Sequence, residues 1–243
     1  MDVKVIGYWG AYPNKGEATS CYLLQQDNFN VLIDLGSGAL SRLQHYHSLE
    51  NIDAVVLSHF HNDHIADLGV FQYACLVQQQ LGKLTSKVPI YASKDDGQAF
   101  QQLNHQATLG KKYDDKKEYQ IGPFTFHFLK TKHPKPCYAM RISDGRSTIV
   151  YTADTSYFDG LVDFTRGADL LIAESSFYKG MDGTKAGHMT SEECGKLAER
   201  AKVKQLLLTH LPHFGDHQDL LKEASEQYQG KIELAYEGLT YHL

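Results

Sequence analysis

Residues 58–64 read Ser-His-Phe-His-Asn-Asp-His, and this stretch decides what kind of protein the chain can be. Three histidines and one aspartate lie within six residues, at His59, His61, Asp63 and His64. They directly follow 53–57, Asp-Ala-Val-Val-Leu, which has the apolar run of a short buried strand. A loop at a strand end can direct alternate side chains to different ions, and zinc prefers imidazole nitrogen and carboxylate oxygen. The pattern therefore predicts a metal site in this loop.

One ion cannot use all of these ligands together, so further ligands are expected elsewhere in the chain. Three candidates follow predicted strands. His133 comes after 124–131, Asp154 after 149–151, and His210 after 206–209. Because strand ends commonly carry the sites of α/β folds, these three side chains are predicted to complete the metal site.

The remaining sequence predicts strands in the first third and strand–helix alternation after it. Strands are expected at 3–9, 21–25, 30–33, 88–91, 124–131, 137–142, 148–151, 170–173, 205–208 and 232–234, and helices at 40–47, 65–81, 95–103, 191–201 and 218–228. Residues 110–118 are expected to form a mixed-charge loop. This order indicates an α/β protein in which helices cover sheets.

Composition narrows the class of protein. The chain has 243 residues, 42% of them hydrophobic, and the absence of an obvious linker predicts a single domain over 1–243. The net charge of −5 argues against an extended nucleic-acid surface. Residues 1–7 do not resemble a secretory signal, and no apolar run is long enough for a membrane helix. Four scattered cysteines, Cys21, Cys75, Cys137 and Cys194, are expected to be reduced and buried in a cytoplasmic protein.

These motifs resemble the metallo-β-lactamase superfamily of metal hydrolases over nearly the whole chain, and most of all its ribonuclease Z-like phosphodiesterase branch. The opening strand with Gly10 and Pro13, the strand 20–24 and Asp34-Leu35-Gly36-Ser37-Gly38 are similar to that branch's first motif. His59, His61, Asp63 and His64 match the second motif, His133 the third histidine, Thr152-Ala153-Asp154-Thr155 the bridging aspartate, and Leu208-Thr209-His210 the last histidine. The resemblance implies a four-layer αββα sandwich with a dinuclear metal site at one edge.

The resemblance also implies how the ligands divide between two divalent ions, expected to be Zn²⁺, with Mn²⁺ the alternative. His59, His61 and His133 would hold the first ion, Asp63, His64 and His210 the second, and Asp154 would bridge them. A hydroxide between the metals would attack phosphorus, and Asp63 could orient it. Asp34 and Ser58 are candidate partners that fix the imidazole tautomers.

A further histidine points to phosphodiester chemistry. His188, in Gly187-His188-Met189-Thr190, is similar to the His-x-Thr element of ribonuclease Z-like enzymes, where the histidine acts at the leaving group. It is therefore predicted to donate a proton to the leaving oxygen. Thr190 and Glu193 are predicted to cap the following helix.

The expected substrate is small and anionic, such as a cyclic nucleotide or short RNA. The segment between His64 and His133 leaves little room for the long arm with which ribonuclease Z grips transfer RNA, so tRNA 3′ processing is only an alternative. The basic pairs 111–112 and 116–117 are interrupted by aspartates and are expected to lie in a solvated loop. Asn62 stands where glycine is usual in that nuclease.

Three other functions remain open at this stage. Tyr157 follows Asp154 at the spacing seen in lactone-hydrolysing relatives, so a lactonase or thioester hydrolase is the main alternative. His213, close after His210, is a candidate pocket residue. A binding module without catalysis would need decayed ligands, and a one-iron thiol dioxygenase would use fewer ligands than this chain carries. The apolar helix face after His64 is a candidate homodimer surface.

Overall fold

A computed structural model describes the whole chain, residues 1–243, and its residues group into two compact units. The first unit contains residues 1–114 and 236–242, and the second contains 115–235 and Leu243. Each unit is built around its own seven-stranded sheet. None of the helices has the length and apolar character that a transmembrane span requires.

The sheet of the first unit has the strand order β14-β1-β2-β3-β4-β5-β6. Its strands are β1 (Asp2–Gly7), β2 (Cys21–Gln26), β3 (Phe29–Ile33), β4 (Ala54–Val56), β5 (Val88–Ser93), β6 (Thr108–Tyr113) and β14 (Thr240–His242). The strands predicted at 21–25 and 30–33 are confirmed as β2 and β3, which form a hairpin: they pair antiparallel through a turn in which Asp27 and Asn28 have φ of 50° and 64°. Positive φ at both central residues matches the right-handed twist of the flanking strands. From β3 to β6 the strands run parallel, so β3 and β4 end at the same edge.

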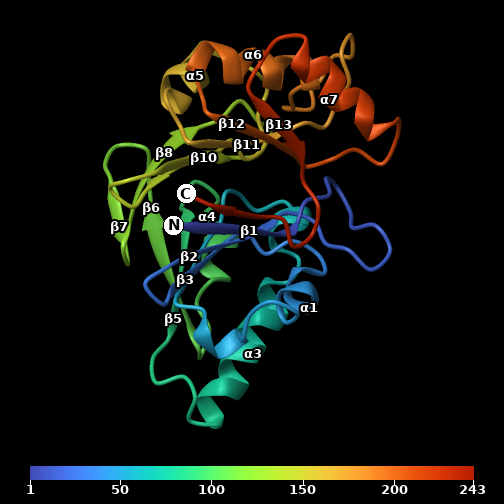
Figure 1. Cartoon of the computed structure of the whole chain (residues 1–243). Helices are drawn as coiled ribbons and strands as arrows, with labels where there is room; N and C mark the ends of the chain where they lie inside the picture. Colours follow the sequence, from blue (N-terminus) through green and yellow to red (C-terminus); the bar gives the residue numbers. More distant parts are fainter. The chain divides into compact units, whose positions relative to one another are not determined.

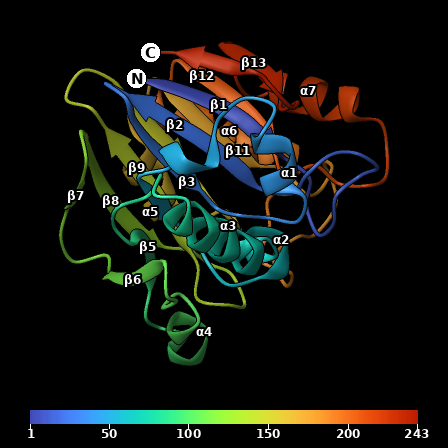
Figure 2. The same cartoon turned by 90° about the horizontal axis from the view of Figure 1, so that it is seen from below.

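Helices lie along one face of this sheet, as Figure 2 shows for α2 and α3. The helices are α1 (Ala39–Leu43), α2 (Asn62–Ile65), α3 (Leu68–Gln80) and α4 (Gly97–Gln101), with a short 3₁₀ turn at Leu49–Asn51. The prediction of one helix over 65–81 is wrong in part, because residues 66 and 67 are not helical and separate α2 from α3. At the break the Asp67 carboxylate accepts the backbone N–H of Leu40 at 2.8 Å, which ties this segment to α1. On the apolar helix face after His64, the α3 side chains of Leu68, Phe71 and Cys75 are buried.

The prediction of a loop over 110–118 is wrong in part. Residues 114–118 form a loop, but residues up to Tyr113 belong to β6, which pairs in parallel with β5. Tyr113 is buried, and its hydroxyl donates to the carbonyl of Leu57 at 2.7 Å, so tertiary contacts override the charged local sequence. Lysines suit this strand because it lies at the sheet edge, where exposed charge opposes pairing with another chain.

The sheet of the second unit has the order β13-β12-β11-β10-β9-β8-β7. Its strands are β7 (Tyr119–Ile121), β8 (Phe124–Lys130), β9 (Tyr138–Ser143), β10 (Thr148–Tyr151), β11 (Leu170–Glu174), β12 (Gln205–Thr209) and β13 (Lys231–Leu234). The strands β10 to β13 pair in parallel, and their buried apolar runs agree with the predicted strand positions. Parallel pairing brings the carboxyl ends of β10, β11 and β12 to one edge.

Three helices cover one face of this second sheet: α5 (Asp159–Thr165), α6 (Ser191–Ala201) and α7 (His217–Ser225) (Figure 1). The predicted capping box is confirmed, because Thr190 and Glu193 each bind the other's backbone N–H at the start of α6. Gly195 allows α6 and α7 to pack closely, since a Cβ there would lie 2.3 Å from the Ala224 carbonyl oxygen.

Candidate metal centre

The first unit brings its four candidate ligands together in the loop and short helix after β4. His59 and His64 are buried, with 1% and 0% of their surface exposed. The His59 Nε2 and His61 Nδ1 atoms are 3.0 Å apart, and His64 Nε2 lies 3.7 Å from Asp63 Oδ2. Two ligands of one tetrahedral zinc ion, each about 2.1 Å from the metal, lie roughly 3.4 Å apart. Both pairs therefore have the spacing that a shared ion requires.

Asp34 and Ser58 support these histidines from behind. Asp34 is fully buried, and its carboxylate accepts the Ser58 N–H at 2.7 Å and the Ser58 hydroxyl at 2.8 Å. The same carboxylate lies 2.8 Å from His64 Nδ1, and Ser58 Oγ lies 3.0 Å from His59 Nδ1. Because both Nδ1 atoms are held in this way, the Nε2 atoms of His59 and His64 are the ones turned toward the ligand cluster.

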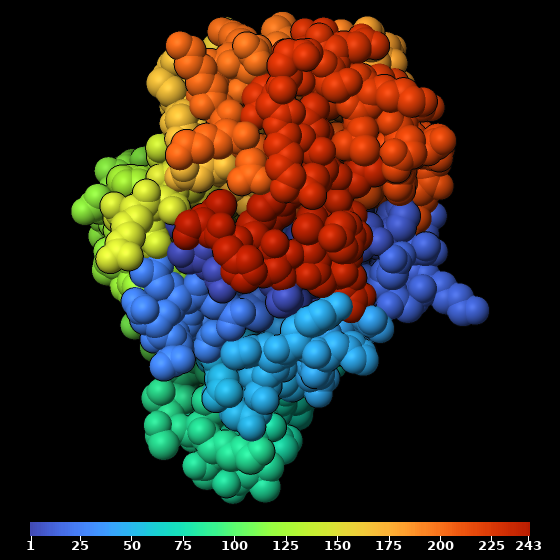
Figure 3. All heavy atoms as spheres, in the orientation of Figure 1, coloured from blue at the N-terminus to red at the C-terminus, as the bar shows by residue number.

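Asp63 is positioned by the loop that follows β1. The backbone N–H of Ala11 donates to Asp63 Oδ2 at 2.9 Å. Glu17 anchors the other end of this loop, accepting the Tyr8 hydroxyl at 2.6 Å and the Trp9 indole N–H at 2.8 Å. The loop stands out from the first unit in blue in Figure 3, and Tyr12 on it is 58% exposed. The loop after β1 therefore orients Asp63, a candidate ligand.

In the second unit, the candidate ligands meet at Asp154. Its Oδ2 lies 3.9 Å from His133 Nε2, and its Oδ1 lies 3.5 Å from His210 Nε2. The two carboxylate oxygens thus face two different imidazoles, as a carboxylate that bridges two ions must. His133 Nδ1 is 3.0 Å from the Gly187 carbonyl oxygen, which fixes its tautomer. Burial lowers the pKa of His133, which favours the neutral imidazole that binds metal.

Glu174, the last residue of β11, is a functional residue that sequence reasoning missed. It is fully buried, and its Oε1 lies 3.0 Å from His188 Nδ1 and accepts the Met189 N–H at 2.9 Å. Its Oε2 accepts the Ser176 hydroxyl at 2.8 Å, and that hydroxyl is also 2.8 Å from His210 Nδ1. Ligand atoms of Glu174, His188 and His210 all lie within 4.8 Å of one another. One carboxylate therefore positions two histidines of the site.

His188 combines a held Nδ1 with access to solvent. Its side chain is 17% exposed, whereas the Glu174 side chain beside it is 1% exposed. Its ring stacks on that of His210, with centroids 5.3 Å apart and planes at 24°. A carboxylate at Nδ1 leaves Nε2 as the nitrogen that can exchange a proton with a substrate.

The two candidate pocket residues have different surroundings. The Tyr157 hydroxyl accepts a hydrogen bond from Arg200 Nη1 at 2.6 Å, and Lys196 Nζ lies 5.3 Å from the centre of its ring. Cations therefore hold Tyr157 on the side of α6. His213 is half-buried three residues after His210, and its role stays a prediction.

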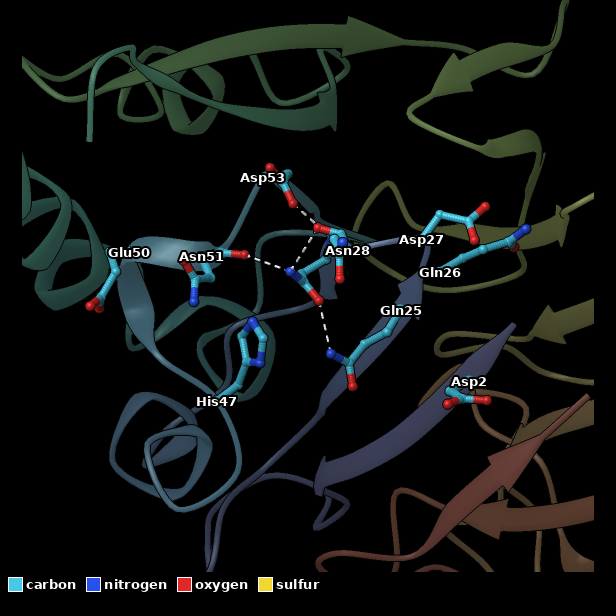
Figure 4. Close-up of a pocket in the computed structure, with 10 residues that line it drawn as sticks. Asp2, Gln25, Gln26, Asp27, Asn28, His47, Glu50, Asn51 and Asp53 are labelled. Carbon is cyan, nitrogen blue, oxygen red and sulfur yellow. Dashed lines mark hydrogen bonds between the residues drawn. The ribbon is translucent and has the colours of Figure 1, made fainter. Parts of the chain in front are cut away.

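A separate polar hollow of about 610 Å³ lies in the first unit (Figure 4). Several of its polar side chains are hydrogen-bonded to one another or to the backbone. Gln25 Nε2 donates to Asn30 Oδ1 at 2.8 Å, Asn30 Nδ2 donates to the Asn51 carbonyl at 2.8 Å, and Asp53 accepts the Asn30 N–H at 2.8 Å. These bonds join the β2–β3 hairpin to the start of β4, so the hollow has a structural explanation.

Comparisons with known proteins agree with this description. A family model described as "Beta-lactamase superfamily domain" matches residues 29–211. The chain is 49% identical over 242 residues to the "Probable metallo-hydrolase YhfI" of Bacillus subtilis, covering 99% of each. The crystal structure of YhfI matches with a TM-score of 0.98 at 48% identity, covering 99% of this chain and 98% of that one.

More distant matches include a ribonuclease Z and a solved structure of the same fold. Ribonuclease Z of Metallosphaera sedula is 23% identical over 277 residues, covering 92% of this chain and 93% of that protein. A crystal structure described as a new diphosphatase from the PhnP family matches with a TM-score of 0.79 at 21% identity, covering 100% of this chain and 97% of that one. Together the matches confirm the predicted fold class and the resemblance to the ribonuclease Z-like branch.

Proposed function

The chain belongs to the metallo-β-lactamase superfamily and is a metal-dependent hydrolase of that fold, and we propose that it cleaves a small phosphodiester. The substrate class would be a cyclic nucleotide or a short RNA. The observation that carries this proposal is the His188–Glu174 pair beside the ligand His210. A buried carboxylate at Nδ1 and a solvent-accessible ring are what a proton donor to a leaving oxygen needs.

The proposed centre uses the seven ligand residues that the family motifs identify. Its members share an imidazole or carboxylate end group and a place at the end of a strand or in the loop after it. We assign His59, His61 and His133 to one divalent ion, Asp63, His64 and His210 to a second, and Asp154 to both. This assignment rests on the family motifs and on the ligand spacings within each unit. The all-nitrogen-and-oxygen donor set favours zinc.

Each part of the site has a chemical task in this proposal. Divalent ions in such a centre neutralise charge on phosphoryl oxygens and lower the pKa of coordinated water. Asp63, held by the Ala11 N–H, would orient the attacking water. His188 would carry the proton at Nε2, because Glu174 accepts the hydrogen bond from Nδ1–H and stabilises the protonated ring.

The structure favours a phosphodiester over a lactone. The lactonase alternative needs a Tyr157 hydroxyl that points at a substrate carbonyl. Here that hydroxyl is engaged by Arg200, and the ring carries a second cation, Lys196.

The test is hydrolysis of bis(p-nitrophenyl) phosphate by the purified protein. Activity should disappear with a chelator and return with zinc or manganese, while the same treatment of a boiled control returns nothing. Protein that binds metal but leaves this diester intact would contradict the phosphodiesterase proposal. The lactone and thioester substrates would then be tested on the same preparation.

A further inference from the structure

A pocket of about 470 Å³ opens beside the proposed ligand His133 in the second unit. It is lined by Lys132, His133, Pro134, Tyr157 and Lys185, among others. No aspartate or glutamate lines it. The pocket therefore has two lysine residues in its wall beside a residue of the proposed catalytic centre.

Hydrogen bonds between three loops fix the walls of this pocket. The Ser156 N–H donates to the Lys132 carbonyl at 3.0 Å, and the Ser156 hydroxyl donates to the Thr184 carbonyl at 3.2 Å. The third tie is the 3.0 Å contact between His133 Nδ1 and the Gly187 carbonyl oxygen. Because these loops hold one another, the pocket is formed before a ligand arrives, which lowers the entropic cost of binding.

The charges around the pocket favour an anion. Lys132 Nζ lies 5.5 Å from the centre of the Phe158 ring, and Lys185 lines the pocket from the loop that also contains Thr184 and Gly187. Asp182, the nearest acid along that loop, does not line the pocket, but its carboxylate accepts the N–H and the hydroxyl of Thr184, and Lys185 helps to lower its pKa. Two exposed lysines and no lining carboxylate still leave the pocket with an excess of positive charge, which suits a phosphate group.

We propose that this pocket binds a second phosphate of the substrate, a terminal phosphate monoester one nucleotide away from the scissile diester. This inference rests on the proposed phosphodiesterase function and narrows its substrate class. Linear short oligonucleotides with a phosphorylated end would be preferred over cyclic mononucleotides, which carry no second anion. The apolar surfaces of Pro134 and Tyr157 would contact the sugar or base between the two phosphates.

The first experiment compares kcat/KM for three adenosine dinucleotides: unphosphorylated, 5′-phosphorylated and 3′-phosphorylated. One of the two phosphorylated forms should be preferred over the unphosphorylated one by roughly tenfold or more. Lys132→Gln and Lys185→Gln should each reduce that preference by about threefold to tenfold. Lys130→Gln, an exposed lysine two residues away that does not line the pocket, should leave the preference unchanged.

The second experiment measures binding without turnover. Isothermal titration calorimetry of chelator-treated protein with adenosine 3′,5′-bisphosphate should show binding. The double variant Lys132→Gln/Lys185→Gln should raise the dissociation constant by at least roughly tenfold. If dinucleotides are cleaved without any preference for a terminal phosphate, the pocket proposal is overturned while the phosphodiesterase proposal stands. If no diester is cleaved but bisphosphate binding depends on both lysines, the phosphodiesterase proposal is overturned while the pocket's affinity for phosphate stands.

Discussion

Gly187→Ala should loosen the metal centre through a single added methyl group. Gly187 has φ of 79°, a conformation that costs an L-residue about 1 kcal/mol. A Cβ there would lie 2.6 Å from Pro134 Cδ, 2.8 Å from His133 Nδ1 and 2.9 Å from His133 Cα. Ordinary contacts begin at 3.4 Å, so these neighbours must move by about 0.5–0.8 Å.

That displacement acts on a proposed ligand and on its support at the same time. Overpacking of this kind costs about 1–3 kcal/mol, which with the backbone term gives roughly 2–4 kcal/mol of lost stability. The Gly187 carbonyl also holds His133 Nδ1, and loss of such a supporting bond lowers metal affinity by about tenfold to a hundredfold.

The chain offers a matched control in the same loop. Gly180 has φ of 82°, but a Cβ there would meet no atom within 4 Å. Gly180→Ala should therefore lose only the backbone term, about 1 kcal/mol, and keep its zinc affinity within about twofold. Denaturant unfolding of chelator-treated protein and zinc competition against a chromophoric chelator measure both quantities. Equal losses in the two variants would refute the steric argument.

Three other changes test the site. Asp34→Asn should weaken zinc binding by about tenfold to a hundredfold, because the carboxylate that holds His64 Nδ1 is lost; a wild-type affinity in the chelator competition would contradict this. His188→Gln should reduce kcat by about a hundredfold or more on a dinucleotide, but much less on a p-nitrophenyl ester, whose good leaving group needs no proton; equal losses on both would remove the proton-donor role. Tyr157→Phe should change kcat/KM for bis(p-nitrophenyl) phosphate by less than about twofold, since its hydroxyl serves Arg200; a collapse on lactones alone would revive the lactonase alternative.

Several candidate ligands could be predicted from sequence because they come at or shortly after the ends of apolar strands. His210 directly follows β12 and Asp154 lies three residues after the end of β10, and parallel pairing brings these strand ends to one edge. The same rule should have found Glu174, but the predicted strand stopped at Ala173. A carboxylate after four apolar residues resembles a solvated strand end, and only its buried contacts with His188 show otherwise.

The features that sequence did not predict depend on contacts between distant segments. The strand β6 carries two adjacent lysines and becomes a strand only because β5 pairs with it and Tyr113 reaches the Leu57 carbonyl. The break between α2 and α3 depends on Asp67, which binds the backbone of α1 rather than continuing a helix. In both cases the contacting segment lies far away in the sequence. Local propensity and periodicity therefore could not predict the strand β6 or the break before α3.

Three of the seven non-glycine residues with positive φ lie where strands lead into the candidate site. Asp34 follows β3 with φ of 61°, Ala153 follows β10 with φ of 49°, and His210 follows β12 with φ of 54°. None of the three is glycine, so each conformation costs about 1 kcal/mol that buried contacts must offset. A left-handed residue turns the chain sharply and can direct a side chain across the strand end. The strained turns at Asp34, Ala153 and His210 thus account for how straight, apolar strands come to present buried polar side chains at their ends.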